Sequence, residues 1–241
     1  KERWGFCISH SQRLSLKKGN YHVVIKSVLE SGCLNYGELI IPGQESEEVL
    51  LSTYVCHPSM ANNEISGPVV TMALANWILG LKNRRYTYRI LFVPETIGAI
   101  AYLSMHWQEM KKKTISGFVL TCVGDERTYS LMPSRLGNTL ADRVALHVSN
   151  NFIQKIKLYS FLDRGSDERQ YCSPLIDLPV VSIMRSKYAE YPEYHTSNDN
   201  LDLISPQGLF GGFEANRKCL HALELNKRYM AVILGEPKMD K

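Results

Sequence analysis

The strongest constraint on the fold is an alternation of short apolar runs with longer helical patterns, which begins near residue 47 and continues through most of the chain. The apolar runs predict strands at 49–56, 88–94, 117–124, 157–162 and 178–184. The patterns between them predict helices at about 66–82, 97–112, 138–152 and 206–229. Such alternation is typical of βαβ units with right-handed crossovers. We therefore expect an α/β domain with a largely parallel sheet over residues 47–241.

Residues 1–46 have a different pattern, in which β-branched and aromatic residues are separated by Gly, Asn and Lys. This pattern favours extended structure, and we expect a small antiparallel β appendage here. The chain enters a strand-like run almost at once and ends in a polar tail. We interpret it as an internal piece of a longer protein.

Composition excludes several classes of function. A net charge of +4 comes from scattered basic residues, and the short run 111–113 is expected to cap a helix C-terminus, so we expect no nucleic-acid partner. No run reaches the roughly 18 apolar residues of a membrane span, and we expect no membrane partner. The six cysteines lack CxxC spacing, and several lie in apolar runs. A reducing cytoplasmic location is the expectation.

Three residues suited to metal binding or proton transfer follow predicted strands. LLSTYVC leads to His57, YRILFVP to Glu95 and GFVLTCVG to Asp125, while His195 follows the strand at 178–184. Because the carboxyl ends of parallel strands form the binding edge of an open α/β sheet, these residues predict one shared pocket.

Each of these residues also has an ordinary structural explanation. His57 could be a partly buried histidine, Glu95 a carboxylate in the first turn of a helix, and Asp125 a turn residue bonded to its own backbone. The segment containing Asp167, Glu168 and Arg169 is either a solvated charge cluster or a wall facing the substrate, where Glu168 or Arg169 would bind a charged terminus.

The tyrosine-rich and acidic run around His195, which includes Tyr194, is typical of a pocket wall. The chain lacks HExxH, GxSxG, P-loop and GxGxxG motifs. This absence argues against zincin proteases, α/β-hydrolases and nucleotide-binding folds. Any chemistry must therefore be assembled from separated strand ends.

Taken in order, six blocks resemble the motif series of the co-catalytic zinc aminopeptidases. These blocks are His57, ANNEISG (61–67), PETIG (94–98), Gly-Asp (124–125), GSDERQYCSP (165–174) followed by Leu-Pro (178–179), and YHTSNDN (194–200). The whole chain is similar to a bacterial family of aminopeptidase-like domain proteins, some of them associated with polysaccharide biosynthesis. The resemblance implies a three-layer fold with a mostly parallel mixed sheet between helices. Residues 1–46 would be the remnant of an inserted antiparallel β domain.

The resemblance also implies a site that holds one or two zinc ions. The ligand positions fall on His57, Asn63, Thr96, Asp125 and His195, and the general base falls on Glu95. Asn63 and Thr96 replace two carboxylates of the family pattern, and Asn63 is a poorer zinc ligand than a carboxylate. Glu64, next to Asn63, is a candidate to supply the lost charge.

Two functions follow from this resemblance. The first is a zinc-dependent amide hydrolase acting on a small peptide or N-acyl substrate, in which metal-bound water attacks the carbonyl and Glu95 is the base. The second is a non-catalytic or repurposed domain that binds a peptide or an amino-sugar intermediate of polysaccharide biosynthesis. Loss of the two carboxylates motivates the second. A scaffold role for the α/β domain is a third possibility.

Overall fold

The structure is a computed structural model that describes residues 5–153, 155–227, 229–232 and 234–235. Residues 1–4, where the first strand-like run begins at Trp4, and the last six residues of the polar tail, 236–241, lie outside the described residues. The chain divides into two compact units, residues 1–33 and residues 34–241.

The first unit contains one short helix and, over residues 5–33, no strand. Helix α1 (His10–Ser15) begins at Ser9, whose side chain accepts a hydrogen bond from the Gln12 backbone N–H. Every described residue from 5 to 33 is exposed, so the apolar runs of this segment have no buried face against which strands could pair. A separate antiparallel appendage is therefore not observed over residues 5–33, and the strand at Gly37–Ile41 instead pairs antiparallel with the main sheet. The interpretation of residues 1–46 as the remnant of an inserted domain stays a prediction.

The second unit is built on a seven-stranded mixed sheet with the order β1-β3-β2-β4-β7-β5-β6. The strands are β1 (Gly37–Ile41), β2 (Glu48–Tyr54), β3 (Thr87–Val93), β4 (Thr114–Val119), β5 (Tyr129–Met132), β6 (Ile156–Leu158) and β7 (Val180–Met184). The four central strands β3, β2, β4 and β7 are parallel. Strand β1 pairs antiparallel with β3, β5 pairs antiparallel with β7, and β6 runs parallel to β5. The expected mostly parallel sheet is confirmed.

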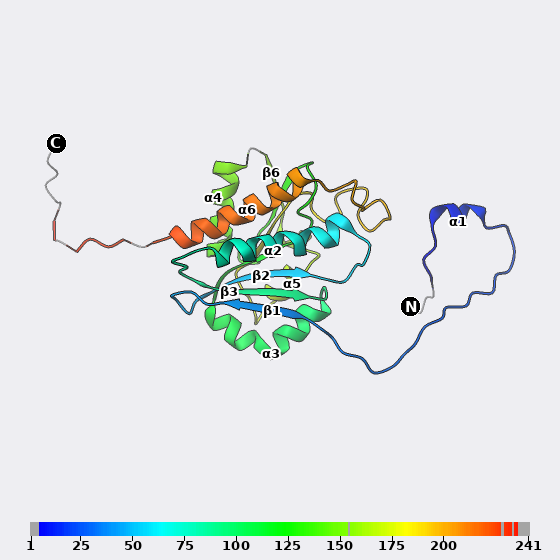
Figure 1. Ribbon diagram of the computed structural model, residues 1–241, viewed down its shortest axis with the longest axis horizontal. Helices are drawn as coiled ribbons and strands as arrows, with labels where there is room; N and C mark the ends of the chain where they lie inside the picture. The colour runs from blue at the N-terminus through cyan, green and yellow to red at the C-terminus, as the bar shows by residue number, and fades with distance from the viewer. Residues whose placement is uncertain (1–4, 154, 228, 233, 236–241) are drawn as a thin grey trace. The chain divides into compact units, whose positions relative to one another are not determined.

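Helices cover both faces of this sheet (Figure 1). They are α2 (Ser66–Leu79), α3 (Ile97–Lys113), α4 (Leu140–Phe152), α5 (Glu168–Tyr171) and α6 (Pro206–Leu225). A π-helical turn, η1 (Ala61–Ile65), precedes α2, and a 3-10 turn, η2 (Phe161–Asp163), follows β6. The three lysines at 111–113 occupy the last turn of α3, as expected from the negative end of the helix dipole.

The two cores follow from the alternation of side chains along β2. Val49 and Leu51 point to the face covered by α2, α4 and α6, where they pack in one cluster with Leu74. Leu50 points to the other face and packs in a second cluster with Tyr102 of α3. All seven residues of β2 are buried, as expected for a central parallel strand. The expected three-layer α/β arrangement, with a mostly parallel mixed sheet between helices, is thereby confirmed.

Two further observations bear on the sequence analysis. No helix in the described residues combines the length and apolar character needed to cross a bilayer. All six cysteines are free thiols, and three of them, Cys122, Cys172 and Cys219, are buried.

Candidate functional site

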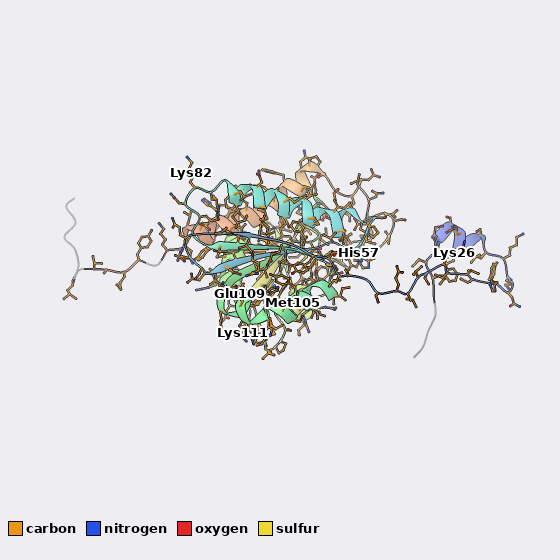
Figure 2. All side chains as sticks on the ribbon, turned by 60° about the horizontal axis from the view of Figure 1, so that its bottom comes forward. Lys26, His57, Lys82, Met105, Glu109 and Lys111 are labelled. Carbon is orange, nitrogen blue, oxygen red and sulfur yellow. The ribbon has the colours of Figure 1, made fainter. Side chains whose placement is uncertain are left out.

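The loop after β2 carries His57 and orients it with a buried carboxylate. Glu64 Oε2 accepts a hydrogen bond from His57 Nδ1 at 3.0 Å, and the other oxygen of Glu64 accepts one from the Cys56 backbone N–H. Glu64 is buried, whereas the His57 side chain retains 28% exposure. A carboxylate on one imidazole nitrogen fixes the ring and its tautomer and leaves the other nitrogen free to bind a metal. His57 lies at the opposite end of the sheet from Lys82 (Figure 2).

Turn η1 is held in place from far along the chain. The Asp199 carboxylate accepts hydrogen bonds from the backbone N–H groups of Asn62 at 2.6 Å and Asn63 at 3.0 Å. A Cβ at Gly67 would lie 2.5 Å from both the Leu120 carbonyl oxygen and Thr53 Oγ1. Glycine is therefore needed where α2 begins against the ends of β2 and β4. These contacts fix the ANNEISG segment beside His57.

Glu95 follows β3 and lies at the beginning of α3. Thr96 has a left-handed backbone with φ of 62°, and its N–H donates to Asp167 Oδ1 at 2.7 Å. The Ser166 hydroxyl donates to Glu95 Oε1 at 3.2 Å. Burial raises the pKa of Glu95, and the hydrogen bond from Ser166 and the charge of His57 partly oppose this effect. The loop before α5 therefore fixes both Glu95 and the residue after it.

Cys56, His57 and Glu95 form a group that could hold a metal ion. Each offers one ligand atom, and the three atoms lie within 4.8 Å of one another. Thiolate sulfur, imidazole nitrogen and carboxylate oxygen are all zinc ligands. Asn63 Nδ2 donates to the Tyr54 hydroxyl at 2.7 Å, and Asn63 Oδ1 is a buried oxygen with no hydrogen-bond partner in the described residues. The donor set of Cys56, His57 and Glu95 fits zinc.

His195 reaches the same place from the loop after β7. Its ring centroid lies 4.9 Å from that of His57, and its ring stacks on Tyr194 at 4.0 Å. Burial and the neighbouring His57 lower the pKa of His195, which keeps its imidazole neutral as metal binding requires. Burial raises the pKa of Tyr194 to about 12. The structure therefore brings together His57, Glu95 and His195, as the strand-end argument predicts.

Asp125 has a different environment. Its Oδ1 accepts from Arg127 N at 2.9 Å and Ser186 Oγ at 2.8 Å. Its Oδ2 accepts from Ser186 N at 2.8 Å and Asn62 Nδ2 at 3.1 Å. Four protein donors thus surround a buried carboxylate, and Asp125 is not part of the metal-competent group in the described residues. Its contacts join the loops after β4 and β7 to turn η1, and its predicted role as a ligand stays a prediction.

The acidic residues of the 165–174 segment are not a solvated cluster. Asp167 and Glu168 are both fully buried. Glu168 accepts hydrogen bonds from the backbone N–H groups of Gly165 and Ser166 and from the Tyr188 hydroxyl. Burial raises the pKa of Asp167 to about 7, with Glu95 and Glu168 adding to the rise. Both carboxylates therefore support the loop that positions Glu95.

Arg169 is the exposed member of that segment. Its Nη2 donates to Thr96 Oγ1 at 3.4 Å, which leaves Thr96 engaged at the position where the family pattern has a carboxylate ligand. The substrate-binding role predicted for Asp167, Glu168 and Arg169 stays a prediction, with Arg169 the accessible candidate.

Sequence reasoning missed Cys56 and Ser166 as site residues. Cys56 ends an apolar strand run, which predicts a buried core cysteine, yet it is exposed and its Sγ lies 3.1 Å from His57 Nδ1. Its position directly before a strand-end histidine was the available signal. Ser166 has no local signal, because its contact with Glu95 joins residues 71 positions apart.

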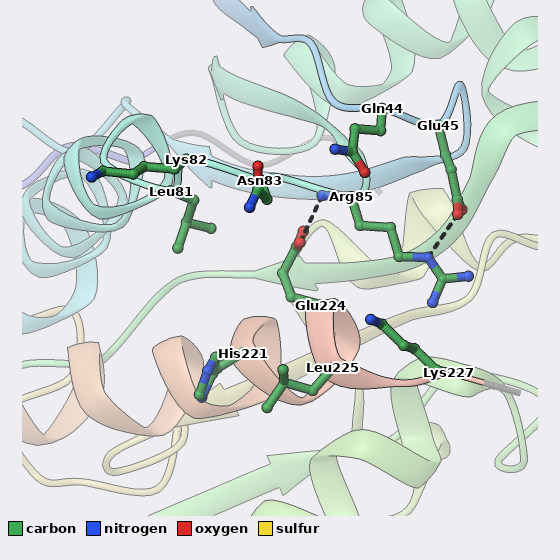
Figure 3. A pocket seen from close by; sticks show the side chains of 10 residues that line it. All are labelled: Gln44, Glu45, Leu81, Lys82, Asn83, Arg85, His221, Glu224, Leu225 and Lys227. Atoms are coloured by element: carbon green, nitrogen blue, oxygen red, sulfur yellow. Dashed lines mark hydrogen bonds and ion pairs between the residues drawn. The ribbon is translucent and has the colours of Figure 1, made fainter. Parts of the chain in front are cut away.

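The hollow shown in Figure 3 lies away from this site. Its volume is about 910 Å³, and it is lined by the loops before β2 and β3 and the end of α6. Arg85 donates there to Glu45 at 2.8 Å, and Glu224 accepts from Arg85 N at 2.7 Å. The amino ends of the strands meet at this edge, so the metal-competent group at the opposite edge is the better candidate for catalysis.

Comparison with known proteins gives the following relatives. The family model described as a domain of unknown function, DUF4910, matches residues 12–226. A Clostridium acetobutylicum protein, provisionally named a polysaccharide biosynthesis protein with an aminopeptidase-like domain, is 40% identical over 230 residues, which are 95% of this chain and 52% of that protein. The chain therefore spans about half the length of this relative.

Solved structures agree with the fold. A crystal structure of a provisionally assigned peptidase from Clostridium acetobutylicum matches with a TM-score of 0.89 and 38% identity, over 99% of this chain and 56% of that one. BSAP, a zinc aminopeptidase from Bacillus subtilis, matches with a TM-score of 0.65 and 14% identity, over 77% of this chain and 49% of that one. The second likeness shows a shared fold alone.

Proposed function

Because the chain belongs to the DUF4910 family and has an aminopeptidase-like fold, we propose that it is a zinc-dependent amide hydrolase of the aminopeptidase type. The observation that carries the proposal is the position of Glu95. Its carboxylate lies within 4.8 Å of the ligand atoms of His57 and Cys56, in a half-buried site at the carboxyl ends of β2 and β3.

The imidazoles of His57 and His195 are the side chains proposed to hold zinc. Glu64 on Nδ1 leaves Nε2 of His57 for the metal, and the lowered pKa of His195 keeps that ring neutral. Asn63 Oδ1 is a further oxygen donor without another hydrogen-bond partner in the described chain. Zinc held there supplies Lewis acidity toward the substrate carbonyl and toward water.

Glu95 is proposed to act as the general base. Its raised pKa is closer to neutrality than that of an exposed glutamate, which makes its carboxylate a stronger base. Ser166 binds Oε1, and in the described residues Oε2 is left to take a proton from the attacking water. The same carboxyl group returns that proton to the leaving amine. Support from Ser166 and from the loop around Asp167 keeps Glu95 in place through both transfers.

The substrate is proposed to be a small peptide or an N-acyl compound. Arg169 is exposed beside Thr96 and carries a positive charge suited to a carboxylate or another anionic group of the substrate. Tyr194 is half-buried next to His195 and offers an aromatic wall. Because the Clostridium relative is named for polysaccharide biosynthesis, N-acyl amino sugars belong in the substrate screen beside peptides.

The test is a hydrolysis screen on the zinc-loaded full chain, with aminoacyl anilides, dipeptides and N-acetylated amino sugars. We expect turnover of at least one class, and Glu95→Gln should reduce kcat by about 10²–10⁴-fold while zinc content stays unchanged. Glu47→Gln is the matched control, because Glu47 is exposed and precedes β2 at the opposite edge of the sheet. Unchanged turnover in Glu95→Gln, or no turnover of any class by the zinc-loaded protein, would contradict the proposal.

A further inference from the structure

We propose that Cys56 is itself a zinc ligand, so that the metal is held by the Cys56 thiolate together with the two histidines. This inference rests on the proposed zinc dependence and adds a ligand of different chemistry to the same site. The ligand pattern implied by the family resemblance contains no cysteine. Cys56 enters through its position in the structure alone.

The first support is proximity. The ligand atoms of Cys56, His57 and Glu95 lie within 4.8 Å of one another. The Cys56 sulfur lies beside the His57 ring, 3.1 Å from the Nδ1 atom that Glu64 also contacts, so a modest rotation of Sγ is needed to share an ion with Nε2. Zinc bonds of about 2.0–2.3 Å in a tetrahedral site put neighbouring donor atoms about 3.3–3.8 Å apart. Cys56 is exposed, so its Sγ can rotate toward a shared ion without displacing core residues.

The second support is charge. Asn63 is neutral, and Thr96 carries a hydroxyl that already contacts Arg169 at 3.4 Å. Asp125 is surrounded by four protein donors. Zinc binding would displace the proton of the Cys56 thiol, and the resulting thiolate restores one negative charge. Sulfur is also among the strongest zinc donors in proteins. Cys56 therefore supplies what the lost carboxylates would have supplied.

The third observation is that one carboxylate, that of Glu64, holds both Cys56 and His57. Glu64 accepts hydrogen bonds from both the Cys56 backbone N–H and the His57 ring. One buried carboxylate thus fixes the backbone of the first ligand and the ring of the second. With Cys56, His57 and His195 as ligands, Glu95 stays free as a base, and Asn63 Oδ1 remains a weak fourth donor.

The test uses cobalt in place of zinc. Thiolate bound to Co²⁺ gives an intense charge-transfer absorption in the near ultraviolet, whereas nitrogen and oxygen ligands do not. We expect this band in the Co²⁺-loaded full chain and its loss in Cys56→Ser. Cys33→Ser is the matched control, because Cys33 is an exposed thiol in the first unit of the chain, and it should keep the band. Losing a residue that is hydrogen-bonded to a metal ligand typically weakens metal binding by ~10–100-fold. The zinc affinity of Cys56→Ser should fall by more than this, because the ligand itself is lost.

A second measurement needs no variant and covers the case in which Cys56→Ser fails to fold. Zn²⁺ should slow alkylation of Cys56 in the wild-type protein by tenfold or more, as followed by peptide mass spectrometry, while Cys33 reacts at an unchanged rate. Tight cobalt binding without the charge-transfer band, or alkylation unaffected by Zn²⁺, would overturn the cysteine ligand and leave the zinc hydrolase standing. If neither Zn²⁺ nor Co²⁺ binds, both proposals fail.

Discussion

Glu64 Oε2 and His57 Nδ1 lie 3.0 Å apart, so a buried carboxylate accepts a hydrogen bond from the ring of a histidine at the end of a central strand. The two residues are seven positions apart, and turn η1 brings the carboxylate back toward the strand end. Because Glu64 also binds the Cys56 N–H, it controls the orientation of the whole strand-end loop. The sequence suggests that Glu64 supplies negative charge to the metal site. In the structure Glu64 acts on that site indirectly, through its hydrogen bond with His57.

Glu64→Gln is expected to weaken zinc binding by about 10–100-fold, because loss of the carboxylate lowers the basicity of His57 and loosens the orientation of its ring. Affinity would be measured by competition with a zinc chelator of known strength. Glu47→Gln, at the other end of β2, should bind zinc as the wild type does. Equal affinities in the Glu64→Gln protein and the wild type would limit Glu64 to a role in folding.

The pH profile of hydrolysis should report the environment of Glu95. The pKa of Glu95 is raised above its ordinary value of 4.5, chiefly by burial. Because only the carboxylate accepts a proton, kcat/KM should fall as the pH falls through this raised pKa. The acid limb should therefore have its midpoint above 4.5, with the slope of a single protonation.

Ser166→Ala should shift the acid limb of the kcat/KM pH profile to higher pH. The Ser166 hydrogen bond favours the charged form of Glu95 and lowers its pKa, so its removal should raise the pKa and shift the acid limb to higher pH. The measurement is kcat/KM against pH for both proteins. A shift to lower pH in Ser166→Ala would show that another group controls the limb.

The central sheet was predictable because buried parallel strands produce apolar runs that are separated by helical patterns. Strand β5 (Tyr129–Met132) was missed, because a four-residue strand gives too short a pattern. The apolar run predicted as a strand to residue 124 leaves the sheet after Val119, and Cys122 then adopts a left-handed backbone with φ of 51°. Tertiary contacts there override a continuous local pattern.

The candidate site was predictable to the extent that it depends on strand ends. His57 and Glu95 follow adjacent parallel strands, which is enough to place them together. The supporting residues are not predictable in this way. Asp199 caps η1 across 137 residues, and Ser166 reaches Glu95 across 71. Such contacts depend on how loops from distant parts of the chain fold over the sheet edge.

Asp125→Asn separates a structural role from the ligand role predicted from sequence. An amide cannot accept from all four donors, and its NH₂ would face groups that themselves donate. Since hydrogen bonds to charged groups each contribute about 1.5–3 kcal/mol, we expect the free energy of unfolding to fall by about 2–4 kcal/mol. Zinc content of the folded protein should be unchanged. Loss of zinc without loss of stability, measured by urea unfolding and elemental analysis, would restore Asp125 as a ligand.

Asp167→Asn should stabilise the protein at alkaline pH. Burial raises the pKa of Asp167 from 3.8 to about 7, so the folded state binds a proton that the unfolded state has already lost between these values. The stability contributed by this proton is complete below pH 3.8 and is lost as the pH rises through 7. At about 1.4 kcal/mol per pH unit, ionising the buried group costs up to about 4 kcal/mol.

Asparagine at position 167 has no charge to bury, so it avoids the cost of ionisation, and it keeps the hydrogen bond with the Thr96 backbone. Its Oδ1 can still accept from the Thr96 N–H, and its Nδ2 replaces an oxygen that has no partner among the described residues. Urea unfolding should therefore show the variant more stable than the wild type at pH 8, with the advantage disappearing toward pH 4. An equal difference at both pH values would mean that Asp167 is not protonated in the fold, and that Glu95 stands beside a permanent negative charge.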